Sequence, residues 1–229
     1  MDSPNAPPAR EPLLHRDVGR RLRNLFGPAQ RAGHITGVLL IAAFAAEMFT
    51  GGPQRWGLSA AALADGRFET LLTSMVSHAG LIHLIVNLSA LSTFSARLTP
   101  HLGFGVRGGW RYGVLLGLSG LAGGLMFLAV HPFGDIPMVG ISGAICGLWG
   151  ATLRLPPERG WALAPLVSRQ VAWGARQFAI SNAIIFAIIF ALVFLSGGGA
   201  GGLAWEAHLG GFLFGLLAVP LFVRHVPLP

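Results

Sequence analysis

Long runs of apolar residues, separated by short stretches rich in glycine, proline and arginine, dominate the chain. A bilayer core is about 30 Å thick and a helix rises about 1.5 Å per residue, so a membrane span needs about 20 mostly apolar residues. With the stretches rich in glycine, proline and arginine taken as boundaries, the apolar runs predict membrane helices over residues 35–50, 79–98, 112–130, 141–155, 178–195 and 203–223. The pattern therefore indicates an all-α, polytopic membrane protein with six transmembrane helices.

The composition agrees with a lipid environment. Of the 229 residues, 53% are hydrophobic and 11% are charged, against about 25% charged in an ordinary soluble domain. All 16 basic side chains are arginines that fall between apolar runs rather than on a soluble face, which argues against nucleic-acid binding. Cys146 is the only cysteine, which excludes an intramolecular disulfide and a cysteine-based metal site.

The arginines also predict the orientation, because short cytoplasmic loops carry an excess of positive charge. Fourteen of them precede the first span, follow the second, fourth or sixth span, or border those loops, whereas Arg55 and Arg67 lie on the opposite side. We therefore expect both termini in the cytoplasm. Residues 1–33 are expected to form a basic, flexible tail without the apolar core of a signal peptide. Residues 34–224 would form the membrane domain and residues 225–229 a short C-terminal tail.

Two outer loops differ sharply in composition. Residues 51–77 scatter Trp56, Phe68 and several leucines among polar residues, which predicts an amphipathic element partly within the outer leaflet. Residues 196–202 consist of one serine, one alanine and five glycines. With so few side chains to pack, this loop is expected to be a mobile cover on the outer face.

Five polar residues in or beside the predicted spans stand out, because lipid disfavours polar groups and each needs a partner or a function. They are His78, His83, Asn87, Ser142 and His208. His83 and Asn87 are four residues apart, so on a helix both side chains project from one face toward a common point. For His78, near the outer end of the same span, bracing the loop is the favoured role.

Ser142 begins the unusually short fourth span. Pro156 and Pro157 end that run, because proline does not continue a helix. Residues 141–154 make only about 21 Å of helix, so a helix that reaches the cytoplasmic interface must begin inside the bilayer, below an irregular segment over residues 133–140. A helix N-terminus beside a hydrated pocket favours developing negative charge. The alternative is that Ser142 is only a helix N-cap.

The position of His208 favours a catalytic role for Ser142 over a role as a helix N-cap. It begins the sixth span and is followed by Gly211 and Gly215, a spacing that lets helix backbones approach closely in lipid. The fourth span offers a similar set of small residues, namely Gly143, Gly147 and Gly150. Close packing of the two spans would bring the His208 imidazole within hydrogen-bond reach of Ser142.

A serine nucleophile requires a base and donors for the oxyanion that forms. The candidate base is His208, and the candidate donors are the Ser142 N–H with the side chains of His83 and Asn87. Within the spans, the sequence offers no obvious carboxylate to complete a triad. Glu206 is two residues from His208, on a different helical face, and is expected on the outer surface. The sequence therefore predicts a Ser/His dyad.

These residues resemble the rhomboid family of intramembrane serine proteases, in its bacterial six-helix form. The family's H-x-x-x-N, G-x-S-G and A-H-x-x-G-x-x-x-G motifs correspond here to His83 to Asn87, Gly140 to Gly143, and Ala207 to Gly215. The motifs occur in the family's order, on the second, fourth and sixth predicted spans.

The resemblance implies a rhomboid-like bundle whose short fourth helix starts inside the membrane. It implies an intramembrane serine endopeptidase that cleaves transmembrane-helix substrates through an acyl-enzyme, with Ser142 and His208 as catalytic residues. His83, Asn87, Gly140 and Ser142 are the corresponding oxyanion and substrate-binding residues. No metal or cofactor is implied, and the expected partners are transmembrane protein substrates and membrane lipid. The expected location is the bacterial cell membrane, with substrate approaching laterally near the second and fifth spans.

Two positions depart from the family pattern. Glu69 and Thr70 stand where many relatives carry Trp-Arg, so the anchoring of the first outer loop is expected to differ. Cys146 stands four residues after Ser142, where many relatives have a Tyr or Phe that packs on the imidazole. We therefore expect His208 to be held differently here.

Two alternative functions are compatible with some of these residues. The first is a catalytically inactive rhomboid-like protein that binds membrane clients, although such proteins usually lack the serine or the histidine. The second is a small transporter or channel with His83, Asn87 and His208 along a polar path. A transporter predicts inverted repeats or more intramembrane charge, and the sequence displays neither.

Overall fold

The chain forms a bundle of helices. The computed structural model describes residues 27–155, 163–195 and 204–223. Across these ranges the regular elements are helices, and a single bridge between extended segments pairs Leu58 with Met138. The predicted all-α class is confirmed.

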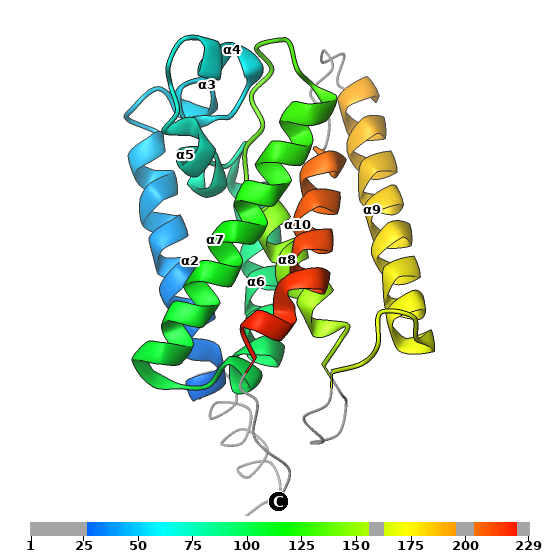
Figure 1. The fold of residues 1–229 in the computed structure, drawn as a ribbon. Coiled ribbons are helices and arrows are strands. Elements are labelled where there is room, and N and C mark those ends of the chain that lie inside the picture. Colours follow the sequence, from blue (N-terminus) through cyan, green and yellow to red (C-terminus); the bar gives the residue numbers. More distant parts are fainter. Residues whose placement is uncertain (1–26, 156–162, 196–203, 224–229) are drawn as a thin grey trace, which may run out of the picture.

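Every predicted span forms a helix (Figure 1). The six helices are α2 (Pro28–Glu47), α6 (Leu81–Leu102), α7 (Gly105–Val130), α8 (Ser142–Thr152), α9 (Arg169–Leu195) and α10 (Trp205–Ala218). Helices α2, α6, α7 and α9 are long and apolar enough to cross a membrane, and α10 continues into the 3-10 turn η1 (Val219–Leu221). At 11 residues, α8 is the short fourth helix that the sequence predicted.

Three helices begin earlier than the apolar pattern suggested. Helix α7 starts at Gly105, seven residues before Tyr112. Helix α2 starts at Pro28, within the segment expected to be tail, because proline suits the first helical position, where the N–H that it lacks would have no intrahelical partner. Helix α9 starts at Arg169, nine residues before Phe178. Its first turns carry Arg169, Gln170, Arg176 and Gln177, which favour helix but carry no apolar signal.

The first outer loop folds into three short helices at the top of Figure 1. They are α3 (Gly52–Trp56), α4 (Ala60–Ala64) and α5 (Thr70–Val76). Leu58 and Ala62 point into the protein, whereas Phe68 and Leu72 are exposed, as expected of an amphipathic element beside lipid. The expected cover over residues 196–202 lies outside the described residues, as do residues 1–26 and 225–229.

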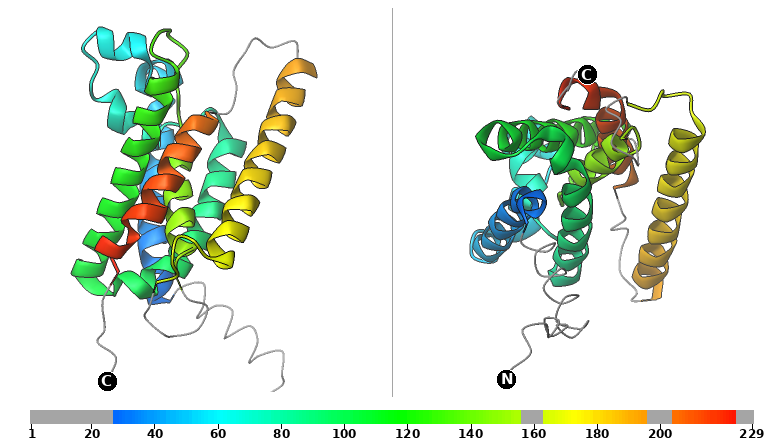
Figure 2. Two further views of the ribbon diagram at one scale, coloured as in Figure 1. Left: turned by 45° about the vertical axis from the view of Figure 1, so that its right-hand side comes forward. Right: turned by 90° about the horizontal axis from the view of Figure 1, so that it is seen from below.

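Helices α8 and α10 lie at the centre of the bundle and pack backbone to backbone (Figure 2). A Cβ atom added at Gly211 would overlap the Gly143 carbonyl oxygen, and one added at Gly215 would overlap the Gly147 carbonyl oxygen. Only glycine allows this approach, as the G-x-x-x-G spacing predicted. Helix α9 stands at the edge, separated from the others along much of its length (Figure 2).

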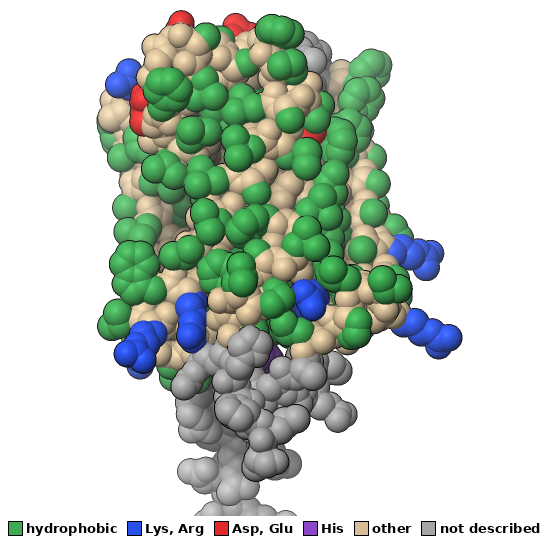
Figure 3. Space-filling view, viewed as in Figure 1, with side chains coloured by type: hydrophobic (Ala, Val, Ile, Leu, Met, Phe, Trp, Pro, Cys, Tyr) green, Lys and Arg blue, Asp and Glu red, His purple; other side chains and the backbone are tan. Residues whose placement is uncertain are grey.

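Apolar side chains cover the outside of the bundle between its two ends (Figure 3). Ile35, Ile82 and Phe190 are 63%, 80% and 62% exposed, which indicates a surface that faces lipid. Arginine side chains gather at the lower end of the view, where α7 and α9 begin. The structure thus confirms a polytopic, membrane-type helical bundle.

Candidate active site

Ser142 is the first residue of α8, and its side chain does not cap the helix. The preceding residue, Ile141, occupies the N-cap position and provides no side-chain cap. The irregular segment before it is fixed by two backbone hydrogen bonds between Leu58 and Met138 and by the Gly140 N–H, which donates to the Ser74 carbonyl at 2.8 Å. The N-cap alternative is therefore wrong, because the Ser142 hydroxyl has a different partner.

That partner is His208, in the first turn of α10. The His208 Nε2 atom lies 2.7 Å from Ser142 Oγ, and the histidine is only 6% exposed. The close packing of α8 on α10 makes this distance possible, since a Cβ at Gly143 would lie 3.0 Å from the Ala207 carbonyl oxygen. The structure thus brings together two residues that are 66 positions apart in the chain.

A third side chain, Asn182 of α9, contacts the other imidazole nitrogen. Its Oδ1 atom lies 2.6 Å from His208 Nδ1, and its Nδ2 donates to the Phe178 carbonyl at 2.9 Å. Sequence reasoning missed this residue. The available signal was a strongly polar residue within the fifth apolar run, four residues after Phe178, where an unpartnered amide is unfavourable.

His83 and Asn87 converge on Gly140, two residues before Ser142. Gly140 has a φ of 115°, and a Cβ there would lie 2.7 Å from His83 Cε1 and 3.7 Å from Asn87 Nδ2. Only glycine combines this backbone conformation with so little space. Among the described residues, the buried Asn87 Nδ2 has no hydrogen-bond acceptor, so it is a donor available to a ligand.

The protonation of His83 follows from its neighbour. Its Nδ1 atom accepts a hydrogen bond of 3.3 Å from the Ala79 N–H, and a neutral imidazole carries its proton on the other nitrogen. The His83 Nε2–H is therefore a donor on the side that faces Gly140. With the free N–H groups of the first turn of α8, the site offers several donors to a developing oxyanion.

A buried carboxylate holds the segment that leads into α6. Glu47, at the end of α2, is 2% exposed and accepts hydrogen bonds from the Ser77 hydroxyl and, at 3.0 Å, from the His78 N–H. Burial lowers the pKa of His78, and the hydrogen bond of its Nδ1 to the Val76 carbonyl opposes that shift. His78 thus braces the loop, in the structural role favoured for it.

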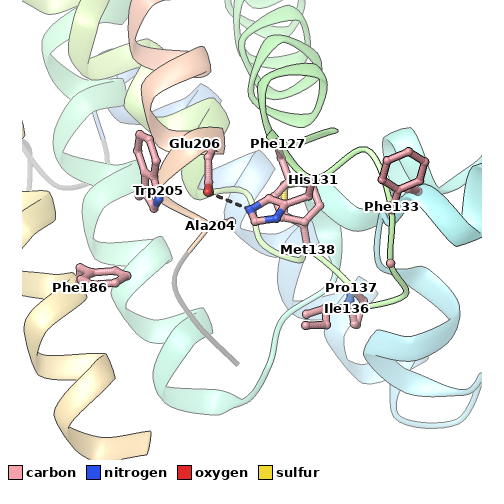
Figure 4. Close-up of a pocket in the computed structure, with 12 residues that line it drawn as sticks. Phe127, His131, Phe133, Ile136, Pro137, Met138, Phe186, Ala204, Trp205 and Glu206 are labelled. Carbon is pink, nitrogen blue, oxygen red and sulfur yellow. Dashed lines mark hydrogen bonds and ion pairs between the residues drawn. The ribbon is translucent and has the colours of Figure 1, made fainter. Parts of the chain in front are cut away.

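A cavity of about 310 Å³ lies between the segment before α8 and the start of α10 (Figure 4), and its lining includes neither Ser142 nor His208. Most of its lining is apolar and includes Phe127, Met138, Phe186 and Trp205. Its polar wall is Glu206, which is 4% exposed and pairs with His131 at 2.9 Å. The expected position of Glu206 on the outer surface is therefore wrong, because its side chain is buried and pairs with the half-exposed His131, which directly follows α7.

Cys146 lies in an apolar cluster with Val171, Phe178, Phe212 and Leu216. The position four residues after Ser142 therefore carries no aromatic ring that could pack on the His208 imidazole. Within the described ranges, no three His, Cys, Asp or Glu side chains lie close enough together to hold a metal ion.

The chain matches a known family of membrane proteins. The family model of the rhomboid domain covers residues 65–225, more than half of the chain. Two similar proteins from Arabidopsis thaliana are RHOMBOID-like protein 5, 35% identical over 39% of this chain, and RHOMBOID-like protein 6, mitochondrial, 40% identical over 36% of this chain. The matched segments make up 27% and 25% of these two relatives. With the six-helix bundle already described, this match shows that the chain belongs to the rhomboid family.

Proposed function

We propose that the protein is an intramembrane serine endopeptidase that uses Ser142 as nucleophile and His208 as general base. The observation that carries the proposal is the 2.7 Å contact between His208 Nε2 and Ser142 Oγ at the centre of an apolar bundle. A serine and a histidine this close form the pair on which acyl transfer depends. Lipid-facing helices around the pair point to substrates that are themselves membrane segments.

The proposed reaction has two stages. His208 Nε2 takes the hydroxyl proton as Ser142 Oγ bonds to the scissile carbonyl carbon, and the carbonyl oxygen becomes an oxyanion. The Ser142 N–H, Asn87 Nδ2 and His83 Nε2–H stabilise that oxyanion. The C–N bond then breaks, and the leaving amine takes the proton from His208. Water, deprotonated by His208, hydrolyses the acyl-enzyme and restores Ser142.

The cavity beside α10 suits part of a substrate chain. It adjoins Met138, two residues before Gly140, and its lining is mainly apolar. We propose that a transmembrane substrate unwinds near its outer end and places side chains there. Small residues at the cleaved position and helix-weakening residues nearby are the substrate features that the family resemblance implies. Lateral access near α6 and α9 is consistent with the exposed Ile82 and Ile184.

The arginine distribution supports an orientation. The exposed Arg107 and Arg176 lie in the first turns of α7 and α9, and these helices begin at the end of the bundle opposite α3–α5 (Figure 1). We propose that this end faces the cytoplasm of a bacterial cell, with both termini on that side and the site opening toward the outer face.

Labelling with a fluorescent fluorophosphonate tests the nucleophile without a known substrate. Purified wild-type protein in detergent is expected to be labelled, whereas S142A and H208A are not. Ser89→Ala is the matched control, because Ser89 is exposed and bonds only within α6 to the Ile85 carbonyl. Folded wild-type protein that neither labels in detergent nor cleaves transmembrane substrates in lipid would contradict the proposal and favour a client-binding role.

A further inference from the structure

Asn182 lies beside the His208 imidazole on the side opposite Ser142. Its Oδ1 is 2.6 Å from Nδ1, while Nε2 is 2.7 Å from Ser142 Oγ. The three side chains come from α9, α10 and α8, so a line of hydrogen bonds crosses three helices. We propose that Asn182 is a positioning residue that holds His208 in the orientation and tautomer in which Nε2 accepts the Ser142 proton. This inference rests on the proposed function.

The direction of the Asn182 amide follows from its own helix. Nδ2 donates to the Phe178 carbonyl at 2.9 Å, a position that the amide oxygen cannot occupy because two acceptors would meet. Oδ1 therefore faces His208. Since Oδ1 only accepts, the proton of the neutral imidazole resides on Nδ1 and the lone pair on Nε2. This is the tautomer that a general base next to a serine requires.

The turn of α9 that carries Asn182 is docked on both helices of the dyad. One turn below Asn182, Phe178 is 6% exposed and stacks on Phe212 of α10 with ring centroids 4.0 Å apart. It also meets Trp149 of α8 edge-on at 5.4 Å. Above Asn182, Ile184 and Ile188 are each 54% exposed. The amide thus sits at the upper end of the packed part of α9, where its position relative to His208 is defined.

The competing explanation is that the Asn182 amide only forms the hydrogen bond that it needs in a lipid environment and does not position His208. A polar side chain in a helix can do so by bonding to the carbonyl four residues earlier, and Asn182 makes that bond through Nδ2. That bond uses none of the acceptor capacity of Oδ1. The acceptor instead meets the one imidazole nitrogen that Ser142 leaves free. In serine-protease triads the third residue has this geometric role, orienting the base and setting its tautomer.

Two nearly isosteric substitutions separate the explanations. Asn182→Leu removes the acceptor and suits a lipid-exposed helix, whereas Asn182→Asp keeps an acceptor oxygen at the same place. The rate of fluorophosphonate labelling is measured against probe concentration, which gives a maximal rate and a half-saturating concentration. For Asn182→Leu we expect the maximal rate to fall about 10- to 100-fold, as for other partners that orient a functional histidine, with the half-saturating concentration changed less than about two-fold. Asn182→Asp should recover most of the loss, because a protonated carboxyl keeps an acceptor toward His208 and a donor toward the Phe178 carbonyl.

The controls distinguish positioning from stability. Ser89→Ala removes a similar bond within a helix, from Ser89 Oγ to the Ile85 carbonyl at 2.9 Å, away from the site, and should label at the wild-type rate. Thermal unfolding in detergent should show both Asn182 variants folded at the assay temperature. Labelling of Asn182→Leu at the wild-type rate would overturn the inference and leave the proposed function intact. Equal losses in the Leu and Asp variants, matched by equal losses of thermal stability, would also overturn it. Failure of the wild-type protein to react would remove the proposed function itself.

Discussion

Gly215 of α10 packs directly on Gly147 of α8, with no room for a side chain between the two backbones. The same relationship repeats one turn away, where Gly211 meets Gly143 next to Ser142. His208 lies on the same helix as Gly211 and Gly215. The closeness with which α10 packs on α8 therefore determines where the imidazole lies. The glycines therefore do more than pack helices, since they set the distance between the Ser142 and His208 side chains.

Gly215→Ala should push the two helices apart. An added methyl group would overlap the Gly147 carbonyl oxygen, and overpacking of this kind destabilises by about 1–3 kcal/mol. We expect a lower unfolding temperature in detergent and slower fluorophosphonate labelling. Gly117→Ala on α7 is the control, because a Cβ there meets nothing within 4 Å. Wild-type stability and labelling in Gly215→Ala would show that α10 tolerates a shift without moving His208.

Asn87→Ala should impair the reaction rather than the fold. Its Nδ2 is buried without an acceptor among the described residues, so its removal leaves no bond broken in the resting protein. Loss of one oxyanion donor lowers kcat by about 10²–10³ in a serine protease. The measurement is kcat and KM for a cleavable transmembrane peptide in lipid, with KM expected to change little. Thr93→Ala is a suitable control, because the exposed Thr93 bonds only to the Ser89 carbonyl of its own helix. An unchanged kcat in Asn87→Ala would remove this side chain from the oxyanion site.

Most of the fold was predictable from the sequence, because a membrane span is a local pattern. Each membrane helix corresponds to its own run of apolar residues in the sequence, and the two prolines after residue 155 visibly shorten the fourth run. Four candidate site residues could be identified in the same way, because polar residues stand out in apolar runs. They are Ser142, His83, Asn87 and His208.

Contacts between distant segments could not be predicted in this way. Glu47 accepts hydrogen bonds from the Ser77 hydroxyl and the His78 N–H, which lie about 30 residues later in the chain. Glu206 pairs with His131, which directly follows α7. The departure at Cys146 predicted that His208 is held differently, but not that α9 would supply the partner. The packing of α8 on α10 left a glycine pattern in the sequence, whereas the approach of α9 to His208 left no such pattern.

Glu47→Ala should destabilise the outer end of the bundle. It would leave the buried Ser77 hydroxyl and His78 N–H without their acceptor, and a buried polar group left unsatisfied costs about 1–3 kcal/mol. We expect a clear loss in the free energy of unfolding, measured by denaturant titration in mixed micelles. Glu69→Ala, which removes an exposed carboxylate at the start of α5, should change it little. Equal effects of the two substitutions would mean that Glu47 contributes no specific support to the segment before α6.

Single cysteines can determine which end of the bundle faces the cytoplasm. The natural Cys146 is buried, so in a Cys146→Ala background one new thiol reports one position. Asp65→Cys lies at the end of α4 and Val106→Cys at the start of α7, both exposed and at opposite ends of the molecule, and neither changes an arginine. If the arginine-rich end is cytoplasmic, a membrane-impermeant maleimide should label Asp65→Cys in intact cells and Val106→Cys only after permeabilisation. The reverse pattern would contradict the proposed orientation and would place the opening of the Ser142 site on the cytoplasmic side.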